Sequence, residues 1–177
     1  MSNIEITLPD GSKRSVEAGT RPIDIAKAIS PRLADAAIVA RINGELYDLT
    51  RPIERDAAVQ LLTNKDPESL EVYRHSTAHL LAAAVLELYP ETKLGIGPPI
   101  ENGFFYEFVR DEPFTQDDLA KIEAKMHEIA ERNVPNERKL LPKPEAVELY
   151  RSANQQFKCE LVEEKATEPM VSFYTTG

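Results

Sequence analysis

The sequence predicts an α+β protein built from two domains, residues 1–63 and residues 64–177. Its length of 177 residues suits one large or two small domains. Short strands with alternating apolar and polar residues fill the first segment, whereas long helical patterns interrupted by short strands fill the second. The charge is divided in the same way: the first segment holds nine acidic and eight basic side chains, and the second holds 21 and 13.

The first segment predicts a small mixed sheet crossed by one helix. Ile4, Ile6 and Leu8 alternate with polar residues before a Pro-Asp-Gly-Ser turn. Asn43-Gly44 is a strong signal for a tight hairpin. The predicted order is two strands, a helix that stops before Pro31, and three further strands, at residues 4–8, 13–17, 21–29, 37–42, 46–49 and 57–62. This order within about sixty residues is a β-grasp arrangement.

The second segment predicts an α+β domain with a mixed sheet. Asp66-Pro67 indicates a helix start and Pro90 its end, and Thr115 with Asp118 forms a capping box. The buried stripe expected on the helix that follows this box is Leu119, Ile122, Met126 and Ile129. Helices are expected at residues 67–89, 115–133 and 144–153, and strands at 93–96, 104–109, 138–141, 157–163 and 170–174. Because the chain stops directly after an apolar strand, we expect this domain to be incomplete at its C-terminus.

Composition narrows the possible classes of protein. A hydrophobic fraction of 42% with 29% charged residues is ordinary for a globular protein. No apolar stretch approaches the ~20 residues of a membrane span, and no secretory signal is visible at the N-terminus. A single cysteine predicts a reducing, cytoplasmic location. The net charge of −9 argues against general binding of nucleic-acid phosphates, so any such contact must be local.

Two of the three histidines, His75 and His79, lie four residues apart on one face of the long helix. Because this helix is apolar nearly all round, we expect both rings to face a protein-lined space. A pair of hydrogen-bonded core histidines is the structural alternative. Catalytic zinc needs three protein ligands, and the further candidates are only His127, which is expected to face solvent, and Cys159. We therefore predict no metal site in this chain.

The glycine-rich segment around Gly97 has neither the ending of a P-loop nor the spacing of a dinucleotide-binding motif. Its glycines permit either close approach to a ligand or tight packing against the helix. Lys158 and Cys159 are neighbours on a predicted strand, so only one of them can line a pocket beside the histidines. No Ser-His-Asp or Cys-His catalytic pair is identifiable from spacing.

Longer stretches resemble a known family. The segments "ITLPDGS" and "ARINGELYDL" resemble a TGS domain, which has a ubiquitin-like β-grasp fold. The segments "EVYRHSTAHLLAAAV", "KLGIGPPIENGFFYEF" and "KIEAKMHEIAERN" resemble the editing domain of bacterial-type threonyl-tRNA synthetases. Their order and spacing match over the whole chain. The resemblance thus implies a TGS domain at residues 1–63 and an editing domain at residues 64–177.

The resemblance implies a site for hydrolysing serine that is wrongly attached to threonine tRNA. His75, His79 and Lys158 match the catalytic positions of the family, with the lysine on a later strand. Tyr106, on the return strand of the glycine hairpin, and Gly97 are the expected substrate-binding residues. The family's second motif, an Asp followed by Cys-x-x-x-His, is expected just after "MVSFYTTG". We therefore expect a truncated domain with impaired deacylase activity.

The resemblance also implies what the rest of the protein supplies. In this family an ATP-dependent ligase core and an anticodon-binding domain follow the editing domain. We expect no cofactor in this fragment, and ATP, magnesium and zinc only in the ligase core. The implied partner is tRNA, the full-length protein is expected to be a cytoplasmic homodimer through that core, and the fragment should not aminoacylate tRNA.

Two other functions are compatible with the residues. One is a freestanding zinc-dependent deacylase similar to alanyl-tRNA editing proteins, which share a two-histidine helix; stoichiometric zinc in the purified protein would favour it. The other is a non-catalytic RNA- or nucleotide-binding module based on the TGS-like domain. The net charge of −9 weakens that hypothesis, and a tRNA-binding measurement would decide it.

Overall fold

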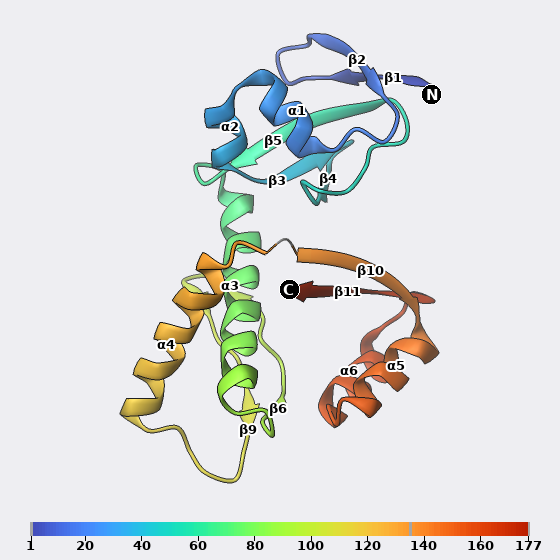
Figure 1. Ribbon diagram of the computed structural model, residues 1–177. Helices are drawn as coiled ribbons and strands as arrows, with labels where there is room; N and C mark the ends of the chain where they lie inside the picture. The colour runs from blue at the N-terminus through green and yellow to red at the C-terminus, as the bar shows by residue number, and fades with distance from the viewer. Residues whose placement is uncertain (1, 135, 177) are drawn as a thin grey trace. The chain divides into compact units, whose positions relative to one another are not determined.

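The computed structural model describes residues 2–134 and 136–176 and confirms the α+β class. The chain divides into two compact units, Met1–Tyr73 and Arg74–Gly177 (Figure 1). This division falls inside the long helix, and the domain boundary between residues 63 and 64 stays a prediction. Within the described ranges, none of the helices combines the length and apolar character that crossing a membrane would require.

The first unit is a five-stranded mixed sheet crossed by a helix, as predicted. The strand order is β2-β1-β5-β3-β4, with β1 parallel to β5 and the other neighbours antiparallel. Its elements are β1 (Asn3–Thr7), β2 (Lys13–Glu17), α1 (Pro22–Ile29), α2 (Pro31–Ala36), β3 (Ala37–Ile42), β4 (Glu45–Tyr47) and β5 (Ala57–Thr63). This is the β-grasp arrangement.

Alternation along β1 builds the core of this unit. Ile4 and Ile6 point to the same face of the sheet and pack in one cluster with Ile25 of α1. The turn between β3 and β4 is the predicted hairpin, in which Asn43 and Gly44 have φ angles of 51° and 93°. Helix α2 is not among the predicted elements, because Pro31 indicates the end of α1 in the sequence pattern and is also the first residue of α2.

In its described part, the second unit combines helices with three small antiparallel sheets, and its first helix begins in the first unit. The predicted single mixed sheet is wrong: within the described residues the strands pair two by two, β6 with β9, β7 with β8 and β10 with β11. Prolines at positions 98 and 99 lack backbone donors, which restricts ladder pairing there. The elements are α3 (Pro67–Leu88), β6 (Lys93–Leu94), β7 (Pro99–Ile100), β8 (Gly103–Phe104), β9 (Phe108–Val109), α4 (Gln116–Glu131), β10 (Asn136–Pro142), α5 (Lys143–Ser152), α6 (Gln156–Lys165) and β11 (Met170–Thr176).

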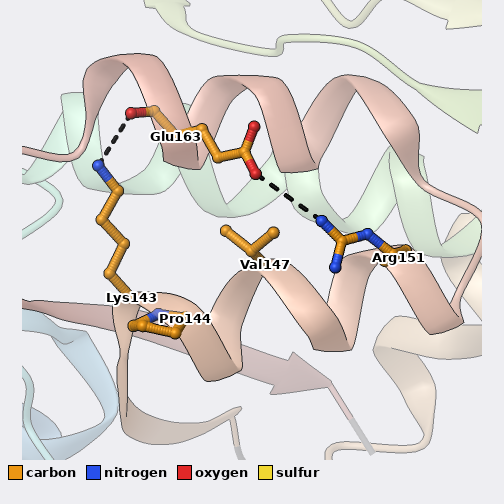
Figure 2. Close-up of a pocket in the computed structure, with 5 residues that line it drawn as sticks. All are labelled: Lys143, Pro144, Val147, Arg151 and Glu163. Atoms are coloured by element: carbon orange, nitrogen blue, oxygen red, sulfur yellow. Dashed lines mark hydrogen bonds and ion pairs between the residues drawn. The ribbon is translucent and has the colours of Figure 1, made fainter.

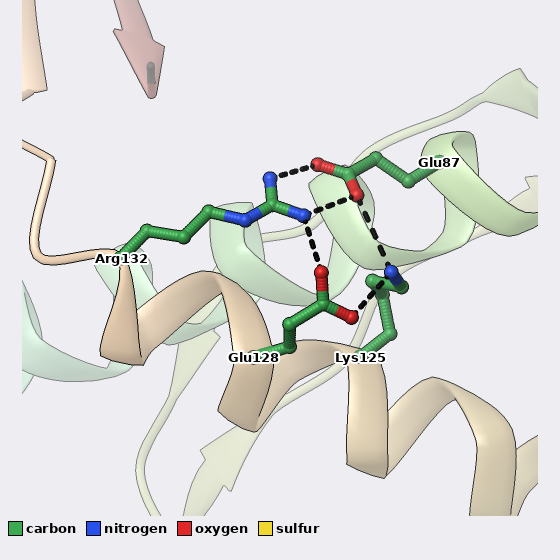
Figure 3. Close-up of polar contacts among 4 residues, drawn as sticks. All are labelled: Glu87, Lys125, Glu128 and Arg132. Atoms are coloured by element: carbon green, nitrogen blue, oxygen red, sulfur yellow. Dashed lines mark hydrogen bonds and ion pairs between the residues drawn. The ribbon is translucent and has the colours of Figure 1, made fainter.

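Helices α3 and α4 pack through an apolar cluster and a polar network. Ala84 and Val85 of α3 and Ile122 and Ile129 of α4 are buried together. The predicted member Leu119 is 51% exposed, because the buried stripe begins one turn later. Beside the cluster, charged side chains bridge the two helices (Figure 3) in a network of Glu87, Lys125, Glu128 and Arg132. This packing fixes the helix that carries the histidines.

The start of α4 is held by the predicted capping box. The Thr115 hydroxyl accepts a hydrogen bond from the Asp118 backbone, and the Asp118 carboxylate accepts from the Thr115 backbone. We expect Thr115→Ala to lower the free energy of unfolding by about 1 kcal/mol, since one helical N–H loses its partner. Urea unfolding followed by circular dichroism measures the loss. Thr115→Ser retains the hydroxyl and serves as control; an equal loss in the serine variant would contradict the capping role.

Helices α5 and α6 pack side by side and line an open surface pocket of about 390 Å³ (Figure 2). The Lys143 ammonium donates to the backbone oxygens of Glu163 and Ala166 at the end of α6, at 2.8 and 3.1 Å. A cation at this position also complements the helix dipole. The Arg151 guanidinium reaches the Glu163 carboxylate at 3.8 Å from the other side.

The strand predicted at residues 157–163 is wrong, because this segment belongs to helix α6. Phe157, Cys159 and Leu161 alternate with polar residues and so imitate a strand. The side chains that are buried are Cys159 and Val162, three apart, which is helical spacing. Lys158 therefore projects from the first turn of a helix.

Candidate active site

The two histidines of α3 contact each other directly. The Nε2 atoms of His75 and His79 are 2.9 Å apart, and the rings stack with centroids 4.8 Å apart. At this distance one imidazole donates its proton and the other accepts it. The spacing of one helical turn therefore produces a pair that shares a hydrogen bond, rather than two independent rings.

Both rings are exposed, so the expectation that they face a protein-lined space is wrong for the described part of the chain. Other residues of helix α3 are buried. Ala78 is fully buried, and Ala82, which continues the stripe of the histidines, is 4% exposed. The histidine face is thus covered at Ala82 but open to solvent at the two rings.

Lys158 approaches the histidines from α6. Its ammonium lies 5.3 Å from the centre of the Tyr106 ring, within the range of a cation–π contact. Burial lowers the pKa of Lys158. The surrounding protein lowers the pKa of His79 by desolvation, and the positive charges of His75 and Lys158 lower it further. The charge of Lys158 is therefore felt at His79.

Tyr106 and Gly97 form a wall beside Lys158. Tyr106 lies between β8 and β9, in a connecting segment rather than on the return strand predicted for it. A methyl group added at Gly97 would overlap the Tyr106 ring, with even Cγ only 2.8 Å away. Burial and the neighbouring Tyr150 raise the pKa of Tyr106 to about 12, so this phenol stays protonated at neutral pH. The five predicted site residues are thus linked by contacts and charge.

The lowered pKa of His79 gives a direct prediction. We expect NMR titration to place its midpoint below the ordinary 6.5, and Lys158→Met to raise that midpoint because one repelling charge is gone. Lys165→Met, on the exposed end of α6, is the control and should not move it. Because the unfolded chain titrates at the ordinary value, His79 contributes stability that is lost as the pH falls below 6.5. A midpoint above 6.5 would contradict the arrangement.

Two further residues hold the site and carry no sequence signal that could have identified them. The Arg74 guanidinium donates to the backbone oxygens of Ile100 and Glu101, at 3.3 and 2.6 Å, and so ties the β7–β8 turn to the helical turn of His75. The Gln155 side-chain amide bonds to the backbone of residues 92 and 94. Both contacts join segments far apart in sequence.

The two remaining candidates for metal ligands, His127 and Cys159, differ in their exposure to solvent. His127 is exposed on α4, as predicted. Cys159 is 2% exposed, and its thiol faces the Val147 carbonyl at 3.5 Å. Within residues 2–134 and 136–176, no group of three or more His, Cys, Asp or Glu side chains is placed to hold a metal ion. The absence of a metal site in the whole chain stays a prediction.

The sequence is similar to one domain family and to a set of curated proteins that share one name. Residues 4–63 match the TGS domain family. The threonine–tRNA ligase of Rickettsia canadensis is 49% identical over 174 residues, covering 98% of this chain and 27% of the relative. That of Pelobacter propionicus is 48% identical over 177 residues, covering 100% of this chain and 28% of the relative. That of Hyphomonas neptunium is 47% identical over 161 residues, covering 91% of this chain and 24% of the relative.

The chain spans about a quarter of the length of the curated relatives it matches. The match to the Pelobacter propionicus relative covers all 177 residues and so extends through both structural units. Residues 4–63 of this protein are a TGS domain, and nearly the whole chain is homologous to the N-terminal region of threonine–tRNA ligases.

Proposed function

We propose that the second unit hydrolyses the ester of serine wrongly attached to threonine tRNA, and that this tRNA is the partner of the chain. The relatives are named for joining threonine to tRNA. Serine lacks one methyl group of threonine, and a pocket gains only about 1–3 kcal/mol from one methylene-sized group. Binding alone therefore gives limited discrimination, and a second, hydrolytic site removes the smaller product.

The observation that carries this proposal is the histidine pair with a cation beside it. Hydrolysis of an aminoacyl ester needs a group that takes a proton from water and a group that stabilises the oxyanion. A histidine with a lowered pKa is neutral at pH 7 and can accept that proton. Lys158, held against Tyr106, supplies a positive charge that acts on His79.

In the proposed reaction, His79 Nε2 donates to His75 Nε2, and a water molecule donates to Nδ1 of His79, the ring nitrogen that carries no proton. Its oxygen attacks the ester carbonyl carbon while His79 takes the proton. Lys158 stabilises the negative charge on the carbonyl oxygen. The bond to the ribose oxygen then breaks, and this oxygen takes up the proton, which leaves free serine and uncharged tRNA. Tyr106 and Gly97 line the space for the substrate.

Single-turnover hydrolysis of labelled seryl-tRNA, with the 177-residue chain in excess, tests the proposal. We expect serine release well above the spontaneous rate, and slower release of threonine from correctly charged tRNA. Dialysis against a chelator should leave the rate unchanged, since water rather than a metal-bound hydroxide is the proposed nucleophile. Release at the spontaneous rate would refute the proposal, and a rate restored only by zinc would favour a metal-dependent deacylase.

A further inference from the structure

We propose that Gln155 is a positioning residue for the hydrolytic reaction: its side-chain amide clamps helix α6 to strand β6 and so holds Lys158 over the Tyr106 ring. The expected effect on the reaction rate rests on the proposed function. The clamp itself rests on the hydrogen bonds of the Gln155 amide.

The Gln155 amide makes two hydrogen bonds to one backbone segment. Its Oε1 accepts from the Leu94 N–H at 2.8 Å, and its Nε2 donates to the Thr92 carbonyl at 3.3 Å. Both the donor and the acceptor of the half-buried amide are therefore used. Gln155 is also the residue that precedes α6, yet its side chain makes no capping bond there, because it is committed to the β6 segment.

The backbone of Gln155 fixes the other side of the clamp. Its N–H donates to the Tyr150 carbonyl at the end of α5, at 2.9 Å. Its carbonyl accepts from the N–H groups of Lys158 and Cys159, at 3.0 and 3.2 Å, in the first turn of α6. Lys158 is thus attached within one helical turn to the residue whose side chain holds β6.

The β6 segment in turn positions the ring under the lysine. Its continuation bonds to the segment that contains Tyr106: Gly95 N–H donates to the Glu107 carbonyl at 2.9 Å, and Glu107 N–H donates to the Ile96 carbonyl at 2.8 Å. One residue further, Gly97 lies against the Tyr106 ring. Gln155 therefore connects both partners of the contact between Lys158 and Tyr106.

Misplacing a reacting group by about 1 Å can cost 10²-fold in rate. A lost clamp leaves Lys158 present but less well placed, so the loss is smaller than that of removing the lysine. We expect Gln155→Met, which keeps the length of the side chain and removes both hydrogen bonds, to lower the single-turnover rate constant about tenfold. The half-saturating concentration should change little, because the tRNA contacts are not altered.

The decisive comparison uses the Lys158→Ala background. A residue that acts through Lys158 has nothing left to position there, so Gln155→Met should cause no further loss. An equal fractional loss in both backgrounds would show a general structural role and overturn the proposal, as would an unchanged rate for Gln155→Met alone. Gln156→Met is the matched control, because that exposed amide donates to Glu160 within α6.

A second variant and a second measurement guard against misfolding and against failure of the proposed function. Gln155→Glu retains the acceptor for the Leu94 N–H but sets a carboxylate oxygen against the Thr92 carbonyl, so it should recover only part of the rate. NMR titration of labelled lysine side chains, with Lys158 assigned through Lys158→Arg, needs no substrate. We expect Gln155→Met to raise the Lys158 pKa toward its ordinary value, because the displaced amine is less desolvated. If the chain hydrolyses no seryl-tRNA, the proposed function fails, and this titration alone decides the clamp: an unchanged Lys158 pKa overturns it.

Discussion

Replacing His79 by alanine is expected to return the release of serine from seryl-tRNA to the spontaneous rate. A positioned general base contributes about 10²–10⁴ in rate, and His79 is the ring whose pKa is lowered by its surroundings. The lowered pKa keeps the imidazole neutral, and therefore able to accept a proton, to a lower pH than an ordinary histidine. The acid limb of the rate profile of the unchanged protein should therefore lie below pH 6.5.

Two controls separate loss of the base from loss of the fold. His127→Ala removes an exposed imidazole on α4 and should leave the rate unchanged. Added imidazole should partly restore the rate of the His79→Ala protein, because the ring is exposed and a free base can reach its place. A rate for His79→Ala within a factor of about two of the unchanged protein would be inconsistent with general acid–base catalysis by this residue.

The second large effect is expected from a single methyl group. In Gly97→Ala the new carbon would overlap the Tyr106 ring, so either the ring or the hairpin must shift. Overpacking of this kind costs about 1–3 kcal/mol in the free energy of unfolding. Because the ring also carries the Lys158 contact, we expect a loss in deacylation rate of about 10²-fold.

A double-variant cycle identifies the cause of that effect. Tyr106→Ala removes the ring that the methyl group would meet, so adding Gly97→Ala to it should cause little further loss of stability. Thermal unfolding of the four proteins measures the coupling. Equal destabilisation by Gly97→Ala with and without the ring would place the conflict in the backbone of the hairpin and contradict the proposed contact.

The first unit could be predicted from sequence because its information is local. Alternation at Ile4 and Ile6, the Asn43-Gly44 turn and the proline that ends α1 each determine a neighbouring stretch of backbone. The histidine helix could be predicted for the same reason, since Pro67 and Pro90 bound it and the spacing of four residues sets the contact between the rings.

The helical state of α6, the exposure of the histidines and the role of Gln155 depend on contacts that local sequence patterns do not encode. The segment of α6 has apolar residues at both strand and helix spacing, and its packing against Val147 and Phe173 decides between them. The openness of the histidine face depends on which α3 side chains meet α4, and the helix is apolar on several sides. Gln155 resembles any surface glutamine in the sequence, and only the fold brings its amide to a strand 61 residues earlier.

That same amide also affects how the protein meets other chains. Among the residues that the structure describes, strand β6 pairs with β9 along one edge, so its other edge would present an open backbone N–H and C=O. Open strand edges are places where a second chain can add a strand and start aggregation. By occupying the Leu94 N–H and the Thr92 carbonyl, the Gln155 side chain closes this edge without a further strand. Removing it should therefore increase self-association as well as slow hydrolysis.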